Sequence, residues 1–145
     1  MSALGLSDSL AHGPCVAFAL AARERYRTVL GFVLIVEAAA GVALLLFPHS
    51  VARLVLDAPP GPAGFTRLAG LLLLILCGLF AAARAFPERA KIANVVGVVG
   101  RGAVAVLLLA GGGRLIAAGL AEAAAAAALG LFYYRYFTAE VMSRP

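Results

Sequence analysis

Hydrophobic residues along this chain form four long stretches, separated by polar, proline-rich or glycine-rich segments. The stretches run from about Thr28 to Phe47, from Phe65 to about Phe86, from Ile92 to Ala110 and from Leu115 to about Tyr134. Each has roughly the 20 apolar residues that a helix needs to cross the hydrocarbon core of a bilayer. The pattern therefore predicts an all-α integral membrane protein, built as a four-helix up-down bundle.

The connecting segments predict where these helices end. Pro48 closes the first stretch, and Ser50 to Leu56 is too short to span, which predicts a short interfacial helix between spans 1 and 2. Asp57 to Gly64 holds three prolines and two glycines and is typical of a loop. The short turns at Pro87 to Lys91 and Gly111 to Gly113 should make consecutive spans antiparallel neighbours.

The two ends of the chain are expected to differ from the bundle. Residues 1 to 27 should form an N-terminal cytoplasmic or interfacial segment, in which Cys15 to Arg27 is a short helix at the membrane surface. The bundle takes residues 28 to 137, and its last part, Phe132 to Phe137, is an aromatic belt at a membrane interface. Residues 138 to 145 are expected to be a polar C-terminal tail.

Composition excludes a soluble domain. Hydrophobic residues make up 63% of the 145 residues and charged residues only 13%, with a mean hydropathy of +1.00. A soluble chain of this length needs far more polar surface. The net charge of +5 would suit nucleic acid, but the basic residues flank the apolar stretches and form no continuous patch. We therefore expect membrane lipid as a partner and no nucleic acid.

The basic residues also predict the orientation. An up-down-up-down path places eight of them on one side of the membrane and three on the other. The eight are Arg23, Arg25, Arg27, Arg84, Arg89, Lys91, Arg135 and Arg144, and the three are Arg53, Arg67 and Arg114. Because lysine and arginine are enriched in cytoplasmic loops, both termini are expected in the cytoplasm.

Three charges interrupt the apolar stretches near mid-span: Glu37 in the first, Arg101 in the third and Glu122 in the fourth. An arginine at that depth costs about 2.5–3.5 kcal/mol on insertion scales, so it normally faces the protein interior and has a partner. At ~1.5 Å per residue the three positions lie within about 3 Å of one level. One guanidinium can serve two carboxylates, which predicts a buried Glu37–Arg101–Glu122 cluster.

Two further polar residues are candidates for contacts in the membrane. Asn94 shares a helix face with Gly97, Arg101 and Ala105, and it is expected to bond to a neighbouring group, with a ligand contact as the alternative. Arg67 lies one turn inside the second span and is expected to be an interfacial anchor, with an anionic lipid contact as the alternative.

The cluster has two interpretations. It is either a structural lock that fixes helix pairing, or a site for protons or a polar headgroup, since ionisable groups inside the membrane are often functional. With both glutamates ionised the cluster carries a net charge of −1, and the glutamate less well paired with Arg101 is expected to hold a proton. The sequence contains no catalytic constellation and no metal-ligand spacing, so we expect no enzyme, no metal and no cofactor.

Three short motifs mark the ends of the first two spans. Leu44-Leu-Leu-Phe-Pro48 closes the first, Arg67-Leu-Ala-Gly70 opens the second and Ala85-Phe-Pro87 closes it. With them, Arg27 to Phe137 resembles small bacterial four-helix membrane proteins of the DoxX-like kind. The resemblance implies a four-helix bundle, often without defined activity and sometimes a companion of a larger membrane system. We expect a multi-pass protein of the bacterial inner (cytoplasmic) membrane.

The chain is also similar to the small multidrug exporters in size, span count and a first-span glutamate, here Glu37. It differs from them because it has no tryptophan, no aromatic residue in its third span, and an arginine there, Arg101.

Two functions are therefore expected. The first is a non-enzymatic accessory or interaction subunit, which contacts other membrane subunits or a second copy of itself through faces of small residues. Gly70, Cys77, Gly78 and Ala81 form such a face in the second span. The alternative is a small proton-coupled carrier, or a protein that binds lipid or quinone headgroups, working through Glu37 and Arg101.

Overall fold

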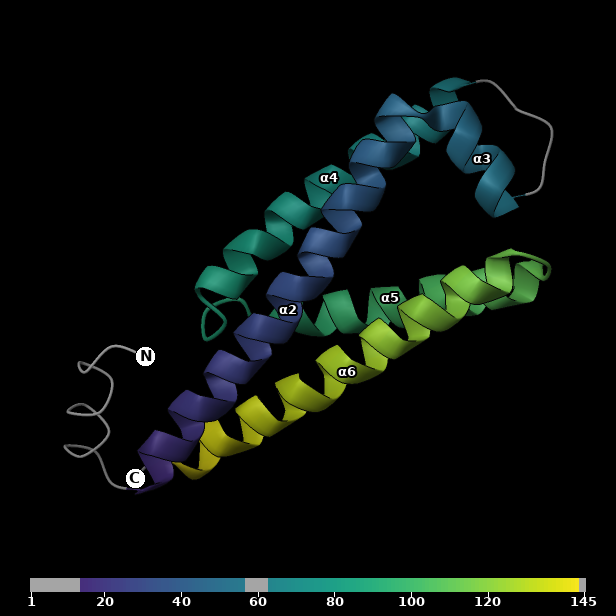
Figure 1. Cartoon of the computed structure of the whole chain (residues 1–145). Coiled ribbons are helices and arrows are strands. Elements are labelled where there is room, and N and C mark those ends of the chain that lie inside the picture. Colours follow the sequence, from purple (N-terminus) through teal and green to yellow (C-terminus); the bar gives the residue numbers. More distant parts are fainter. Residues whose placement is uncertain (1–13, 57–62, 144–145) are drawn as a thin grey trace.

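The computed structural model describes residues 14–56 and 63–143, and these residues fold into five helices without a strand. The helices are α2 (Pro14–Leu46), α3 (Pro48–Leu56), α4 (Ala63–Ala85), α5 (Lys91–Gly111) and α6 (Leu115–Met142) (Figure 1). Within these ranges, all except α3 are long and apolar enough to cross a membrane. The predicted all-α architecture of four spans, with a short helix between the first two, is confirmed.

The loop expected over Asp57 to Gly64 lies mostly outside the described residues, and its last two residues already belong to α4. The other turns are where the sequence predicts them. The turn between α5 and α6 contains Gly112 and Gly113, whose φ angles of 69° and 55° lie in the left-handed region that favours glycine.

The prediction of a separate surface helix over Cys15 to Arg27 is wrong. These residues belong to α2, a single helix of 33 residues. At ~1.5 Å per residue α2 is about 50 Å long, well beyond the ~30 Å hydrocarbon core. The helix continues because its arginines bind the end of α4 and the turn that follows it: Arg23 pairs with Glu88 of that turn at 3.1 Å, and Arg27 Nε donates to the Arg84 carbonyl at 3.1 Å.

The expected polar tail from residue 138 is also helical as far as Met142, because α6 extends over 28 residues. Both α2 and α6 therefore project beyond the bilayer core at the same end of the molecule. We call this the arginine-rich end. It carries Arg23, Arg25, Arg27, Arg84, Arg89, Lys91 and Arg135.

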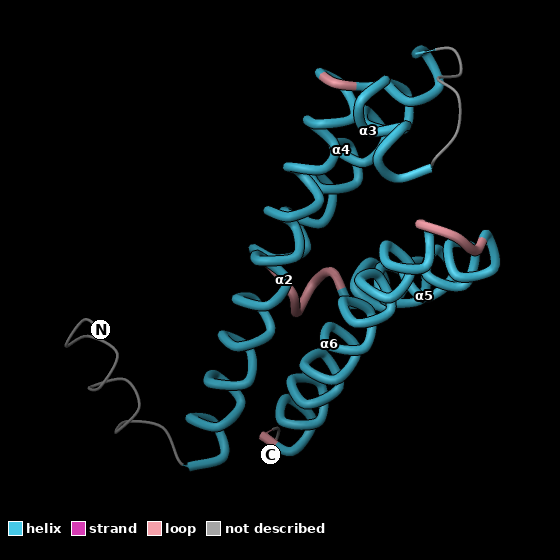
Figure 2. The backbone as a smooth tube through the Cα atoms, turned by 45° about the vertical axis from the view of Figure 1, so that its right-hand side comes forward, coloured by secondary structure: helices cyan, strands magenta, loops and turns pink. Residues whose placement is uncertain are grey.

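The four spans are not arranged as a closed square. α2 packs against both α4 and α6, and α6 also packs along α5, which gives the order α4–α2–α6–α5 (Figure 1). The backbones of α2 and α5 stay apart, and these two helices meet through the side chains of Glu37 and Arg101. α4 and α5 are consecutive in the chain but meet only near their connecting turn, and they diverge from there (Figures 1 and 2). One side of the bundle is therefore open between α4 and α5.

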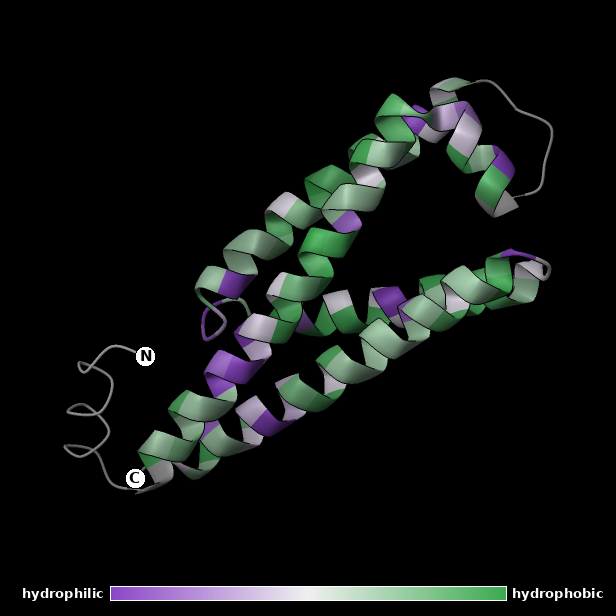
Figure 3. Cartoon of the chain, viewed as in Figure 1, coloured by the Kyte–Doolittle hydropathy of each residue, from purple (hydrophilic) through white to green (hydrophobic). Residues whose placement is uncertain are grey.

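Ion pairs, hydrogen bonds and stacked rings hold the two ends of the bundle. At the arginine-rich end, Lys91 pairs with Glu140 at 3.0 Å, and the buried rings of Tyr26 and Tyr136 stack 6.1 Å apart. At the other end Arg114 donates to the carbonyls of Arg53 and Leu54 at 3.4 Å. A cation beside the last carbonyls of α3 also complements its dipole. Hydrophilic residues gather at these ends, with few along the spans (Figure 3).

Candidate functional site

Arg101 faces the protein interior because of the pattern on one face of α5. Asn94, Arg101 and Ala105 lie on that face and are buried. Gly97 lies between them, and a Cβ atom there would come within 2.6 Å of the Phe80 ring of α4. The valines on the opposite face of α5 are exposed, as expected for a surface that meets lipid.

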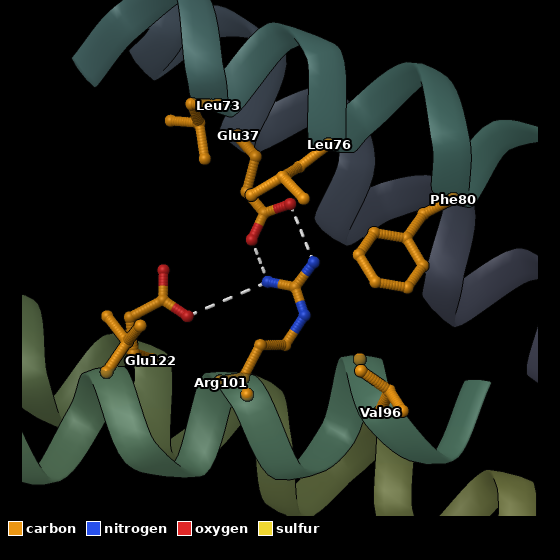
Figure 4. Close-up of a pocket in the computed structure, with 10 residues that line it drawn as sticks. Glu37, Leu73, Leu76, Phe80, Val96, Arg101 and Glu122 are labelled. Carbon is orange, nitrogen blue, oxygen red and sulfur yellow. Dashed lines mark hydrogen bonds and ion pairs between the residues drawn. The ribbon is translucent and has the colours of Figure 1, made fainter. Parts of the chain in front are cut away.

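The guanidinium of Arg101 connects three helices. Its Nη2 donates a hydrogen bond of 2.6 Å to Oε2 of Glu37 on α2, and its Nη1 pairs with Oε1 of the same carboxylate. The same Nη1 lies 3.6 Å from Oε2 of Glu122 on α6 (Figure 4). The structure therefore brings together the three mid-span charges that the sequence placed at one depth.

The two carboxylates are held unequally. The side chain of Glu37 is 12% exposed and takes both arms of the guanidinium fork, whereas that of Glu122 is 28% exposed. The ion pair at 3.6 Å is the one polar contact of the Glu122 carboxylate with the described residues, and it is longer than a hydrogen bond. Glu122 is therefore the member of the cluster that has acceptor capacity left for another molecule.

A cleft of about 260 Å³ lies over this cluster, between the diverging helices α4 and α5. Glu37, Arg101 and Glu122 line it together with apolar side chains (Figure 4). The apolar lining consists of Leu73, Leu76 and Phe80 from α4 and of Val96, Gly97, Gly100 and Val104 from α5. Leu76, Val96 and Val104 are exposed on the outer surface, so the cleft opens toward the lipid.

The charge of the cleft follows from its lining. Two carboxylates face one guanidinium, and no other basic side chain of the described residues lines the cleft. With both acids ionised the site carries a net charge of −1 where little water can screen it. A buried charge without compensation is costly, so one further positive charge, either a proton or a cationic group, would stabilise the site.

The two remaining candidate residues lie outside the cleft. Asn94 is 2% exposed, and its side-chain amide donates to the Pro87 carbonyl at 3.4 Å, which agrees with the expected contact to a neighbouring group. Arg67 is exposed on the first turns of α4, and its lipid contact stays a prediction.

Sequence reasoning missed the contribution of α4 to the site. The Cys77 thiol is buried and lies 3.8 Å from both Oε2 of Glu37 and the Leu34 carbonyl, so it packs beneath the cluster. Gly70 and Cys77 are seven residues apart and both are buried, whereas Gly78 and Ala81 are exposed. The small-residue pattern could have shown that α4 packs closely on α2, but not that Phe80 and Leu76 line a cleft.

Comparisons of the chain with protein families, with curated proteins and with solved structures find no match. The resemblance to DoxX-like proteins therefore stays a prediction. What the fold defines is a multi-pass membrane protein of four apolar helices with an ion-paired cluster in the middle of its spans.

Proposed function

We propose that this protein is a non-enzymatic membrane protein that binds a small amphiphile in the cleft between α4 and α5. The observation that carries the proposal is the position of the charged cluster at the base of an apolar cleft that opens toward the lipid. A cluster that served only as a lock would be best protected by helices on every side. Here Glu122 remains 28% exposed, although an unshielded carboxylate is costly in the membrane.

The charge of the site selects the class of ligand. Arg101 already uses both arms of its fork on Glu37, whereas the Glu122 carboxylate is free to accept hydrogen bonds. A cationic headgroup would pair with Glu122 and bring the net charge of the cluster from −1 to zero, whereas a neutral hydrogen-bond donor would leave it at −1. The sequence predicted a site working through Glu37 and Arg101; in the proposed mechanism these two residues hold the site together and Glu122 contacts the ligand.

The size of the cleft limits how the ligand lies. Small-molecule pockets usually measure about 300–1,000 Å³, so a cleft of about 260 Å³ takes a headgroup and the first part of an alkyl chain. The rest of the chain would lie between α4 and α5 or in the surrounding lipid. A ligand that reaches the middle of the membrane has to be soluble there, which favours a lipophilic cation over a phospholipid headgroup.

The proposal also connects to the carrier function expected from the sequence. Either a proton or a cationic ligand can neutralise the single negative charge of the cluster. Binding of the one therefore weakens binding of the other. Exchange of one for the other at Glu122 is the elementary step of a proton-coupled carrier.

The experiment measures binding of decyltrimethylammonium to the purified protein in nanodiscs, with empty nanodiscs and a neutral decyl alcohol as references. This probe keeps its positive charge at any pH. Glu122→Gln should weaken binding about tenfold or more, because it removes the attraction to the cation. The matched control Glu24→Gln changes an exposed glutamate at the arginine-rich end and should leave binding unchanged. Equal binding by all three proteins would overturn the proposal.

A second function has its own supporting observation. A Cβ atom on Gly78, Gly100 or Gly102 would meet no atom within 4 Å, although glycine in a transmembrane helix commonly marks a helix contact. These open glycines on α4 and α5 support an accessory subunit that packs against partner helices. Gly100 lines the cleft, so a partner helix packed there would cover it, whereas Gly78 and Gly102 lie outside the cleft. Native mass spectrometry of the protein extracted from its own membrane distinguishes the two functions. A stable complex that is lost in Gly78→Leu and Gly100→Leu supports the subunit, and a single chain with a bound amine supports the ligand site.

A further inference from the structure

A second groove, of about 370 Å³, lies between α2 and α6 at the arginine-rich end. On α2 its lining residues Phe18, Ala21 and Arg25 are spaced three, four and seven residues apart, so they share one face. On α6 the same spacing joins Phe132 and Arg135. The groove thus has apolar walls and one arginine from each helix, and no carboxylate lines it.

Arg25 and Arg135 differ from the other basic residues near them. Arg23 pairs with Glu88, and Lys91 pairs with Glu140. Arg27 contacts both Glu24 and the Arg84 carbonyl. Neither Arg25 nor Arg135 has a polar partner among the described residues. Two unpaired guanidinium groups in one groove form a site for an anion, because each can donate two hydrogen bonds to phosphate oxygens.

The depth of the two arginines identifies the source of that anion. Arg25 lies twelve residues from Glu37 along α2, and Arg135 lies thirteen residues from Glu122 along α6. At ~1.5 Å per residue both lie about 18–20 Å from the mid-membrane cluster. The hydrocarbon core ends about 15 Å from the middle of the bilayer, so both guanidinium groups reach the level of the phospholipid headgroups.

The remaining lining residues suit the rest of a lipid molecule. Phe132 lies one turn closer to the membrane interior than Arg135 and provides an apolar surface for an acyl chain. The exposed Tyr134 has a phenol hydroxyl that can donate to the headgroup. We infer that the groove between Arg25 and Arg135 binds one anionic phospholipid, whose phosphate contacts both arginines and whose chain follows α6 past Phe132.

The test uses the full-length protein in detergent micelles, titrated with phosphatidylglycerol or phosphatidylcholine, with bound lipid counted by native mass spectrometry. The wild type should retain one phosphatidylglycerol in preference to phosphatidylcholine. Arg25→Gln/Arg135→Gln should lower the affinity for phosphatidylglycerol about 20- to 30-fold, since each arginine near a headgroup contributes about 1 kcal/mol.

A matched double variant with the same net charge controls for the loss of two positive charges. Arg53→Gln/Arg89→Gln also removes two exposed arginines, neither of which lines the groove, and it should bind phosphatidylglycerol as the wild type does. Equal retention of this lipid by the two double variants would overturn the inference. Displacement of the lipid by millimolar inorganic phosphate would also contradict it, because the groove would then be a site for free anions. This experiment is independent of the amine site, since none of the four arginines lines the cleft.

Discussion

Gly41 of α2 and Gly70 of α4 bring the backbones of these helices into direct contact. A Cβ atom on Gly70 would lie 2.7 Å from the carbonyl oxygen of Gly41, and one on Gly41 would lie 3.1 Å from the carbonyl oxygen of Gly70. Neither carbonyl can move without shifting its helix. This crossing therefore fixes α4 against α2, on the side away from α5, and so maintains the opening in which the cleft lies.

Gly70→Ala should destabilise the pair of helices. The added methyl group meets backbone atoms, and overpacking of this kind typically costs about 1–3 kcal/mol. Thermal unfolding in detergent, followed by far-UV circular dichroism, measures the loss. Gly78→Ala is the matched control on the same helix, because a Cβ atom there meets nothing within 4 Å. If both variants unfold at the wild-type temperature, the close crossing does not contribute to stability.

Removing the guanidinium should cause the largest loss of stability in the spans. Arg101→Gln leaves two carboxylates facing each other without a cation, and breaking a buried ion pair on one side costs about 3–5 kcal/mol. The triple variant Arg101→Gln/Glu37→Gln/Glu122→Gln removes every charge and should regain most of this stability. The comparison is made by the same unfolding measurement. A triple variant as unstable as Arg101→Gln would show that packing of the arginine stem, and not charge balance, is the cause.

The sequence was sufficient to predict the cluster for a simple physical reason. A charged side chain in a transmembrane segment needs an oppositely charged partner inside the protein. Glu37 and Glu122 are the carboxylates that lie at the depth of Arg101. The spans were predictable in the same way, because the hydrophobic length they need is set by the bilayer. The pairing of charges and the length of the spans can therefore be predicted without knowing how the helices cross.

The open arrangement of α4 and α5 could not be predicted in that way. Gly70 and Gly78 are both small, and only the rotation of α4 about its axis decides that Gly70 meets α2 while Gly78 stays open. The length of α2 cannot be predicted from its own sequence, because the contact that holds its first part is made by Arg23 with Glu88 from another part of the chain. Contacts between distant segments, rather than local pattern, determine both features.

The expected orientation can be tested by cysteine labelling in sealed right-side-out vesicles, in a Cys15→Ser background that keeps the buried Cys77. Because basic residues are retained in the cytoplasm, the arginine-rich end should face inward. Ser143→Cys, just after α6, should then be protected from a membrane-impermeant maleimide, and His49→Cys, at the start of α3, should be labelled. The opposite labelling pattern would invert the proposed topology and would place the Arg25–Arg135 groove in the outer leaflet.

Gly97→Ala should alter the cleft with little effect on the rest of the bundle. The new Cβ atom would lie 2.6 Å from the Phe80 ring, which is a side chain and can rotate, so the ring should move within the cleft that it lines. A smaller cleft should bind decyltrimethylammonium more weakly, by about tenfold, while the unfolding temperature changes little. Gly102→Ala on the same helix is the matched control, because its Cβ atom would meet nothing within 4 Å and Gly102 does not line the cleft. If Gly97→Ala and Gly102→Ala bind the amine equally well, the ligand does not occupy the space beside Phe80, and the amine site would have to lie elsewhere on the protein.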